Sequence, residues 1–295
     1  MSQTIKFASI SIAVAVSVLG LKLWAAWITG SVALFSDALE SIINVATALA
    51  AFIAIRLAAR PATSLMPFGY HKAEYISAVV EGVLIVAAAL LIFHQAWQGF
   101  SSPRQVDAPL SGISISLFAS AINGIWSIVL VRQGRRLLSP ALEADGHHLW
   151  TDVVSSIGVA VGLVLAIVTG QPQLDALLAA LVGVNILWSG WRLLASSVSS
   201  LMDVSVPKEQ LEAIRQTISA NAQGAIEAHD LRARQAGSMT FVDFHLVVAG
   251  AMPVSEAHAI CDRIESNIRS IIEKVAITIH VEPEEKAKHS GIFVL

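Results

Sequence analysis

The sequence predicts an all-α bundle of six transmembrane helices followed by a C-terminal α+β domain of the ferredoxin-like type. Of its 295 residues, 55% are hydrophobic and only 14% are charged, about half the charged share that is typical of a soluble domain. The apolar residues are grouped into six long runs, whereas charged residues return at ordinary density after Met202. We therefore expect a transmembrane domain at 1–202 and a soluble domain at 203–295.

Each of the six apolar runs is long enough to cross a bilayer as a helix. The predicted spans are 7–30, 31–55, 75–97, 110–131, 149–170 and 174–198. The first run is too long for the apolar part of a signal peptide and leads into no small-residue cleavage site, so we expect it to be retained.

Basic residues concentrate in alternate short loops, and this asymmetry predicts the orientation. Arg56, Arg60 and Lys72 lie between spans two and three, Arg132, Arg135 and Arg136 lie between spans four and five, and the other loops offer only Arg104. Loops rich in Lys and Arg stay in the cytoplasm. We therefore expect a multi-pass protein of the inner (cytoplasmic) membrane with both termini and the soluble domain in the cytoplasm.

Several functional classes are disfavoured by what the sequence lacks. Cys261 is the only cysteine, so neither an intramolecular disulfide nor a thiolate zinc cluster can form, and we expect a buried apolar role for this residue. No basic cluster suggests a nucleic-acid partner, and no phosphate-binding glycine loop or nucleophile elbow is present. The sequence does not resemble that of an enzyme.

Ionisable and polar residues inside the second and fifth spans suggest a metal site. Ionisable groups in hydrocarbon are costly and usually face a bundle interior. Glu40 and Asn44 are four residues apart, as are His148 and Asp152, so each pair projects from one face of a helix. Two such helices could supply four ligands for Zn²⁺ or a similar ion, with two carboxylates to neutralise its charge. The simpler alternative is that His148 and Asp152 only bond to each other near a helix start.

Two further acidic residues lie one turn before this set. Asp37 precedes Glu40 and Asp145 precedes His148. Either could be a ligand in a vestibule to the site, but a charge at a helix N-terminus is the preferred interpretation.

The soluble domain shows the pattern helix, strand, strand, helix, strand at 208–220, 225–234, 239–248, 255–272 and 275–281. Alternation in the second and third strands places His245 and His280 on polar faces. Four of the nine histidines fall within these elements, close in sequence to one carboxylate; the set is His229, His245, His258, His280 and Glu282. So many histidines in strands and helices favour a second metal site.

These residues resemble the cation diffusion facilitator family of metal transporters, and the resemblance covers essentially the whole chain. The motifs that carry it are 30–34 (GSVAL) and 36–41 (SDALES) in span two, 68–74 (FGYHKAE) before span three, and 148–153 (HLWTDV) in span five. The resemblance implies a transport site at Glu40, Asn44, His148 and Asp152. The family usually has His or Asp at the first of these positions and Asp at the second, so this chain departs from the pattern twice.

The resemblance also implies further features outside the transport site. The cytoplasmic histidines and Glu282 match regulatory zinc positions at which ions bridge a dimer in relatives. Lys72 and Asp203 match positions that pair across the dimer in some relatives, and we expect an interlock pair there.

We therefore predict a homodimer in the lipid bilayer that exports a divalent transition metal, Zn²⁺ first, in exchange for protons by alternating access. His148 and Glu40 are the leading proton carriers, because Asn44 cannot titrate. One alternative is a transporter of the same family for Fe²⁺, Co²⁺ or Mn²⁺. Another is a membrane metal sensor or scaffold that does not transport, for which Asn44 is the main argument; an intramembrane metalloenzyme is weaker still, because no additional base is identifiable.

Overall fold

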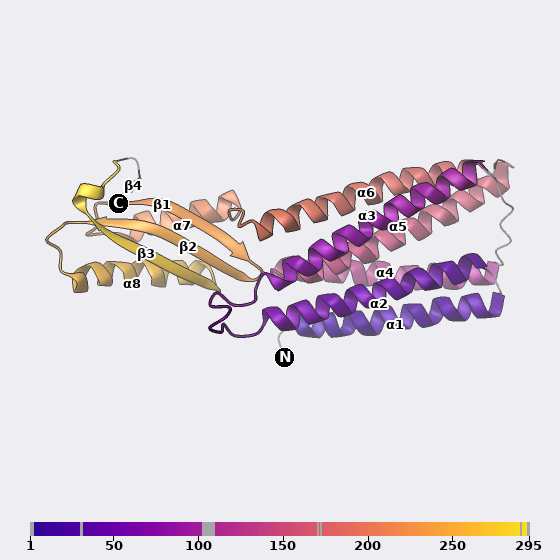
Figure 1. Ribbon diagram of the computed structural model, residues 1–295, viewed down its shortest axis with the longest axis horizontal. Coiled ribbons are helices and arrows are strands. Elements are labelled where there is room, and N and C mark those ends of the chain that lie inside the picture. Colours follow the sequence, from indigo (N-terminus) through magenta and orange to yellow (C-terminus); the bar gives the residue numbers. More distant parts are fainter. Residues whose placement is uncertain are drawn as a thin grey trace. The chain divides into compact units, whose positions relative to one another are not determined.

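The chain forms two compact units, residues 1–198 and 199–295, which are described separately (Figure 1). The structure, a computed structural model, describes residues 3–29, 32–101, 110–169, 171, 173–289 and 291–293. Side chains at 26, 29, 32–37, 39–40, 95, 110–113, 159–160, 162–168, 175 and 293 are not described. Asp37 and Glu40 are among these, so both predicted site residues lie outside the described side chains.

The described part of the first unit consists of six long helices. These are α1 (Gln3–Thr29), α2 (Val32–Ala58), α3 (Ala73–Ser101), α4 (Leu110–Arg136), α5 (Pro140–Thr169) and α6 (Gln173–Leu201). The predicted fold class is confirmed. Within the described residues α1, α2, α3, α4 and α6 contain segments long and apolar enough to cross a membrane, while much of the apolar half of α5 falls on residues whose side chains are not described.

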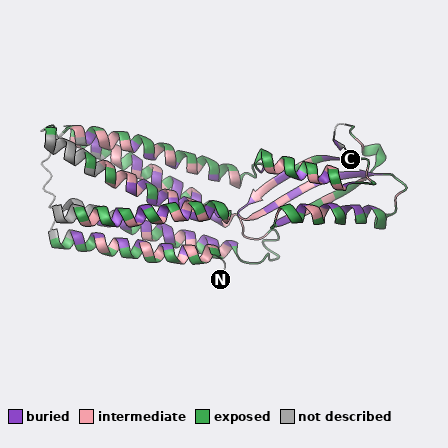
Figure 2. Cartoon of the chain, turned by 180° about the vertical axis from the view of Figure 1, so that it is seen from behind, coloured by how far each residue is buried: buried purple, intermediate pink, exposed green. Residues whose placement is uncertain are grey.

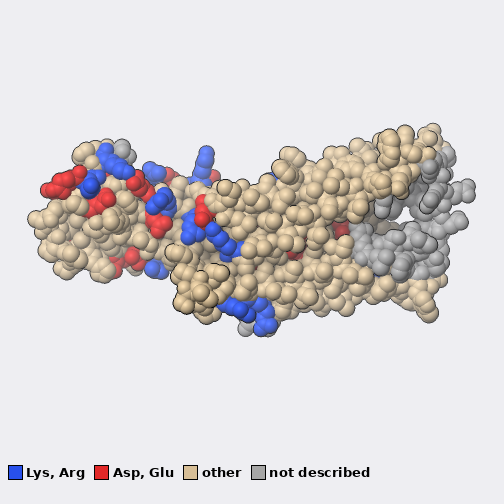
Figure 3. All heavy atoms as spheres, viewed as in Figure 1, with Lys and Arg blue, Asp and Glu red and all other residues tan. Residues whose placement is uncertain are grey.

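The outer surface of the helical unit is apolar, as a lipid-facing surface requires. Exposed residues line the outward faces of the helices in Figure 2. Among the large apolar side chains exposed on these helices are Trp27, Trp97 and Trp188. Charged atoms gather over the soluble unit in Figure 3, whereas most of the visible helical surface carries none. This distribution accounts for the low charged content of the chain.

Glycines allow α4 and α5 to approach closely at the level where α5 carries its polar residues. A Cβ atom added at Gly146 would lie 2.9 Å from the backbone nitrogen of Val131, a distance that real Cβ atoms do not adopt. The Ser127 hydroxyl also donates a hydrogen bond to the Gly146 carbonyl at 2.8 Å. The position of α5 is therefore fixed against α4 by backbone contact.

The second unit is an α+β domain with one four-stranded sheet. Its elements are α7 (Lys208–Asn221), β1 (Glu227–Ala236), β2 (Met239–Val248), α8 (Val254–Ile271), β3 (Val275–Pro283), a 3₁₀ turn (Glu284–Lys286) and β4 (Ile292–Phe293). The sheet order is β3-β2-β1-β4, with β1 antiparallel to β2 and to β4, and β2 parallel to β3.

Both helices of this domain cover the same face of the sheet. Val242, Phe244 and Leu246 of β2 are buried in one core with isoleucines of α7 and α8, as the alternation of the strand predicts. The neighbouring residues of β2, including His245, point to the other face. Within the described residues no helix packs on that second face, so polar side chains there are available for binding.

The structure extends or adds to the predicted elements in two places. Helix α5 begins at Pro140 rather than at Leu149, because the polar residues before Leu149 face other helices and do not interrupt the helix. The short strand β4 and the 3₁₀ turn follow β3 and were not predicted.

Candidate metal centres

Three of the four predicted transport-site residues come together between α2 and α5. The Nε2 atom of His148 donates a hydrogen bond to Oδ1 of Asn44 at 2.9 Å. The amide nitrogen of Asn44 in turn donates to Oδ2 of Asp152. Asn44 and His148 are buried. The spacing of four residues on α5 places His148 and Asp152 on one face, one turn apart, so that both reach the same amide.

The donor chemistry of this cluster suits a divalent transition metal. With Nε2 of His148 donating, its Nδ1 atom carries a lone pair, and this atom is buried with no hydrogen-bond partner among the described residues. A buried polar atom without a partner is unusual and requires an explanation. One imidazole nitrogen, one carboxylate and one amide oxygen are ligands that zinc and its neighbours accept.

Asp145 lies inside α5, and the preferred interpretation of this residue as an N-terminal helix charge was wrong. The residue is buried, and its Oδ2 atom accepts a hydrogen bond from the Ser11 hydroxyl of α1 at 2.5 Å. Its Oδ1 atom has no partner within the described set. The helix begins at Pro140, so Asp145 lies in its second turn and faces the bundle.

Two buried polar residues on α3 and α4 were not predicted as site residues. Glu81 accepts a hydrogen bond from Ser77 at 3.3 Å, and its other oxygen has no partner among the described residues. Asn123 of α4 is also buried, with its Oδ1 atom unpartnered in the same described set. The sequence predicts Glu81 to hydrogen-bond inside the bundle, as it does, and Asn123 could have been flagged in the same way as a polar residue inside an apolar run.

Three of the four histidines predicted as ligands in the soluble domain form a row across the open face of the sheet. In the strand register His229 of β1 pairs with His245 of β2, and His245 pairs with His280 of β3. The ring centroids of His229 and His245 are 5.3 Å apart, and those of His245 and His280 are 5.0 Å apart. The register therefore brings together three imidazoles that lie far apart in the sequence.

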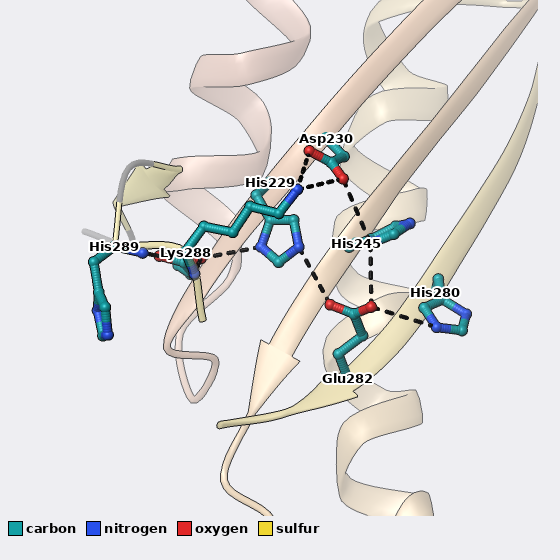
Figure 4. A network of polar contacts seen from close by, with 8 residues as sticks. His229, Asp230, His245, His280, Glu282, Lys288 and His289 are labelled. Carbon is teal, nitrogen blue, oxygen red and sulfur yellow. Dashed lines mark hydrogen bonds and ion pairs between the residues drawn. The ribbon is translucent and has the colours of Figure 1, made fainter. Parts of the chain in front are cut away.

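Glu282 lies among these three histidines (Figure 4). Its Oε2 atom is 3.2 Å from Nε2 of His229, and its Oε1 atom is 3.3 Å from Nδ1 of His245 and 3.6 Å from Nε2 of His280. Glu282 and His280 are two residues apart on β3 and so share a face. The negative charge of this carboxylate lies close to three imidazoles. Protons on the imidazoles or a bound metal ion would neutralise that charge.

Asp230 completes this cluster through a β-bulge. The register of β1 and β2 shifts between His229 and Arg232, and Asp230 adopts a left-handed backbone with φ of +54°, which Asp tolerates better than most residues. Ligand atoms of His229, Asp230 and His245 all lie within 4.8 Å of one another, as a metal ion would require. Sequence reasoning missed Asp230, because a bulge is not visible in an alternating pattern.

Glu227 holds His229 from the opposite side to Glu282. Its Oε1 atom lies 3.0 Å from Nδ1 of His229, and its two oxygens accept backbone hydrogen bonds from Lys288 and His289. Burial alone would raise the pKa of the Glu227 carboxyl, but these hydrogen bonds lower that pKa below its ordinary value. A carboxylate that fixes one ring nitrogen orients the other, here Nε2 beside Glu282, toward the place where a metal would bind.

His258 is not part of the histidine row. It lies on α8, which covers the opposite face of the sheet, and its side chain is 73% exposed beside Asp262. It lines an open pocket of about 460 Å³ together with Cys261 and Glu265. Cys261 is buried, as predicted, and this burial raises the pKa of its thiol.

The predicted interlock pair is divided between the two units. Lys72 directly precedes α3, whereas Asp203 follows α6. The Oδ1 atom of Asp203 forms an ion pair with Nη1 of Arg234 of β1 at 3.0 Å. The pairing of Lys72 with Asp203 stays a prediction.

Family models match both units. The model described as the cation efflux transmembrane domain matches residues 8–202, and that described as the cytoplasmic domain of cation efflux proteins matches residues 206–284. The chain belongs to the cation diffusion facilitator family. The family consists of metal transporters and not of enzymes. This chain is therefore a multi-pass membrane protein that moves divalent metal ions.

Relatives in this family match over nearly the whole chain. The chain is 46% identical over 282 residues to the "uncharacterized transporter sll1263" of Synechocystis sp., covering 96% of this chain and 91% of the relative. It is 32% identical over 271 residues to the cation-efflux pump FieF of Cronobacter sakazakii, covering 92% and 89% respectively. A solved structure described as the zinc form of CzrB is 44% identical and covers 29% of this chain and 98% of that one, with a TM-score of 0.28.

Proposed function

We propose that this transporter exports Zn²⁺ from the cytoplasm in exchange for protons, with Glu40, Asn44, His148 and Asp152 as its transport site. The observation that carries the proposal is the convergence of Asn44, His148 and Asp152 between α2 and α5. Their mutual hydrogen bonds place three ligand types around one point inside an apolar bundle. Glu40, one turn before Asn44 on α2, would supply the fourth ligand and a second negative charge.

Proton exchange follows from the ligand chemistry. A metal ion binds carboxylates and a neutral imidazole, so ligands must lose protons before the ion binds. Glu40, Asp152 and His148 can take up protons when the ion leaves, whereas Asn44 cannot. A site that alternates between ion and protons couples the two flows when the helices rock about it.

The cytoplasmic cluster supports a second, regulatory role for the metal. His229, His245, His280 and Glu282 offer nitrogen and oxygen donors on a face that no described helix covers. His258, exposed on α8, would act from a second copy in a homodimer. Zinc bound there would favour one arrangement of the two copies, because a ligand shifts a conformational equilibrium by its difference in affinity for the two states.

The orientation and the domain roles complete the proposal. The transmembrane domain is 1–202 and the regulatory and dimerisation domain is 203–295. Both termini are in the cytoplasm, because basic residues concentrate in the loops on that side of the inner membrane.

The test is transport in proteoliposomes with an imposed pH gradient. We expect uptake of Zn²⁺ that disappears in Asp152→Asn, which removes one charge at constant shape. Glu209→Gln, on the exposed face of α7, is the matched control and should transport normally. A monodisperse elution profile of Asp152→Asn distinguishes lost function from lost fold.

The same assay with Fe²⁺, Co²⁺ and Mn²⁺ separates the alternatives. Stronger uptake of one of these ions than of Zn²⁺ would show that the cargo differs from our proposal. Binding of metal without uptake of any ion would favour a membrane sensor or scaffold. That alternative has one observation in its favour, because Asn44 already bonds to both His148 and Asp152 without an ion.

A further inference from the structure

The segment after β3 closes over one end of the cytoplasmic cluster. We define the C-terminal strap as the described residues 284–289 and 291–293, which lie beyond the part that matches the family's cytoplasmic domain, apart from the first of them. Its strand β4 pairs with β1 at the sheet edge, with Glu227 opposite Phe293 and Ala228 opposite Ile292. A Cβ atom added at Gly291 would lie 2.4 Å from the Ala228 carbonyl oxygen. The strap therefore lies against β1 at backbone contact.

The strap places a positive charge on a carboxylate of the candidate metal cluster. The Nζ atom of Lys288 lies 2.7 Å from each oxygen of Asp230. Asp230 is also one of the three residues whose ligand atoms lie within 4.8 Å of one another. Figure 4 shows the Lys288 ammonium bonded to both oxygens of Asp230, one of which also lies 4.0 Å from Nδ1 of His245.

We infer that Lys288 is a built-in competitor for the cytoplasmic metal site, and that metal bound through Asp230 displaces it and loosens the strap. The inference rests on the cytoplasmic site proposed above. An ammonium and a divalent cation repel each other, and both need the same carboxylate oxygens. The site would therefore fill only above a metal concentration that Lys288 helps to set.

The exposure of the pair makes displacement feasible. The side chains of Lys288 and Asp230 are 49% and 45% exposed, and exposed ion pairs of this kind change an equilibrium by only about twofold to fivefold. A divalent ion with several other ligands can exceed that contribution.

Loss of this ion pair would remove one of the contacts that hold the strap and leave those to Glu227. The backbone nitrogens of Lys288 and His289 donate to the Glu227 carboxylate at 2.6 Å and 3.0 Å, and Glu227 also holds His229. The strap, Glu227 and His229 thus share one network with the metal cluster. After the ammonium leaves Asp230, the strap would be held by these backbone hydrogen bonds and by the short pairing of β4 with β1, and would therefore be looser than before.

The first test is Zn²⁺ titration of the full-length protein by calorimetry at low ionic strength. The background is Asp152→Ala, which removes the transmembrane site. We expect Lys288→Gln to bind Zn²⁺ about twofold to fivefold more tightly, and high salt to shrink the difference. Lys288→Arg should bind like the parent. Lys286→Gln, an exposed lysine of the same strap, is the matched control and should also leave the affinity unchanged.

The second test is hydrogen exchange of the same protein with and without Zn²⁺. We expect faster exchange at 287–293 when the metal is added and unchanged exchange in β2. Equal affinities in Lys288→Gln and its parent, or greater protection of the strap with Zn²⁺, would overturn this inference alone. Binding that is absent, or unaffected by His245→Ala, would overturn both the cytoplasmic site and the inference that rests on it.

Discussion

The Nε2 atom of His148 on α5 lies 2.9 Å from Oδ1 of Asn44 on α2. The same Asn44 side chain donates to Asp152, so one amide joins the two α5 residues of the proposed transport site. An amide is a weaker ligand than a carboxylate and cannot carry charge, but it can hold the two neighbouring ligands in place. Asn44 is therefore the residue whose replacement is most informative about this site.

Replacing Asn44 should change metal binding in opposite directions according to the substitute. Asn44→Asp adds a negative charge beside Asp152, and we expect it to tighten Zn²⁺ binding roughly tenfold or more. Asn44→Ala removes a ligand and the bonds to both neighbours, and should weaken binding. Calorimetric titration of the purified proteins measures both. Weaker binding by both variants would mean that Asn44 serves the site through geometry and not as a ligand position.

Replacing Gly146 tests whether the contact between α4 and α5 positions the site. Gly146→Ala places a methyl group 2.9 Å from the Val131 backbone, and overpacking of this kind destabilises by about 1–3 kcal/mol. We expect a lower unfolding temperature and slower transport, since α5 carries His148 and Asp152. Gly20→Ala is the matched control, because nothing lies within 4 Å of its added Cβ atom. Equal unfolding temperatures for the two variants would show that α4 and α5 can move apart at Gly146 without loss of stability.

Replacing Glu227 tests its support of His229 in the cytoplasmic cluster. Glu227→Gln keeps the shape but weakens the hold on the imidazole, and such supporting carboxylates are typically worth about tenfold to a hundredfold in metal affinity. Titration with Zn²⁺ in the Asp152→Ala background should show this loss. Glu285→Gln, on the exposed 3₁₀ turn, should bind like the parent. An unchanged affinity in Glu227→Gln would assign Glu227 to the strap alone.

The same carboxylates predict how the cytoplasmic domain responds to acid. The pKa values of Glu227 and Asp230 are lowered in the folded protein from ordinary values of 4.5 and 3.8. A carboxyl group whose pKa is lower in the folded than in the unfolded protein stabilises the folded state. This stabilisation is complete above the pKa of the unfolded protein and is lost as the pH falls through the pKa of the folded protein. We expect β1 and β4 to lose hydrogen-exchange protection below about pH 4.5, after correction for intrinsic rates. Glu227→Gln should show a smaller loss across the same range.

The spacing of apolar and polar residues was sufficient to predict the helices and strands, because the burial of one face imposes this spacing directly. The alternation of Val242, Phe244 and Leu246 predicted both β2 and the face on which His245 lies, and these apolar side chains are buried. Likewise, the spacing of His148 and Asp152 predicted that they share a face of α5. These patterns depend only on helix and strand geometry.

Other features depend on contacts that a single sequence does not display. The bulge that turns Asp230 toward His245 and the two-residue strand β4 leave no periodic signal. The start of α5 at Pro140 was not predicted, because the polar residues before Leu149 resemble the first turn of a helix until α1 and α4 are seen to pack against them. Glu227 could have been found, since it lies two residues before His229 on the same face of one strand.

The hydrogen bonds between Asn44, His148 and Asp152 bear on the alkaline-earth ions, which are far more abundant in cells than free zinc. An ion that binds at this site must replace both bonds and also accept an imidazole nitrogen as a ligand. Mg²⁺ and Ca²⁺ prefer oxygen ligands, and Mg²⁺ gives up its water reluctantly. We expect Mg²⁺ and Ca²⁺ to bind these ligands too weakly to replace the two hydrogen bonds. The hydrogen-bonded, ion-free state of the site therefore selects against the ions that compete most often with zinc.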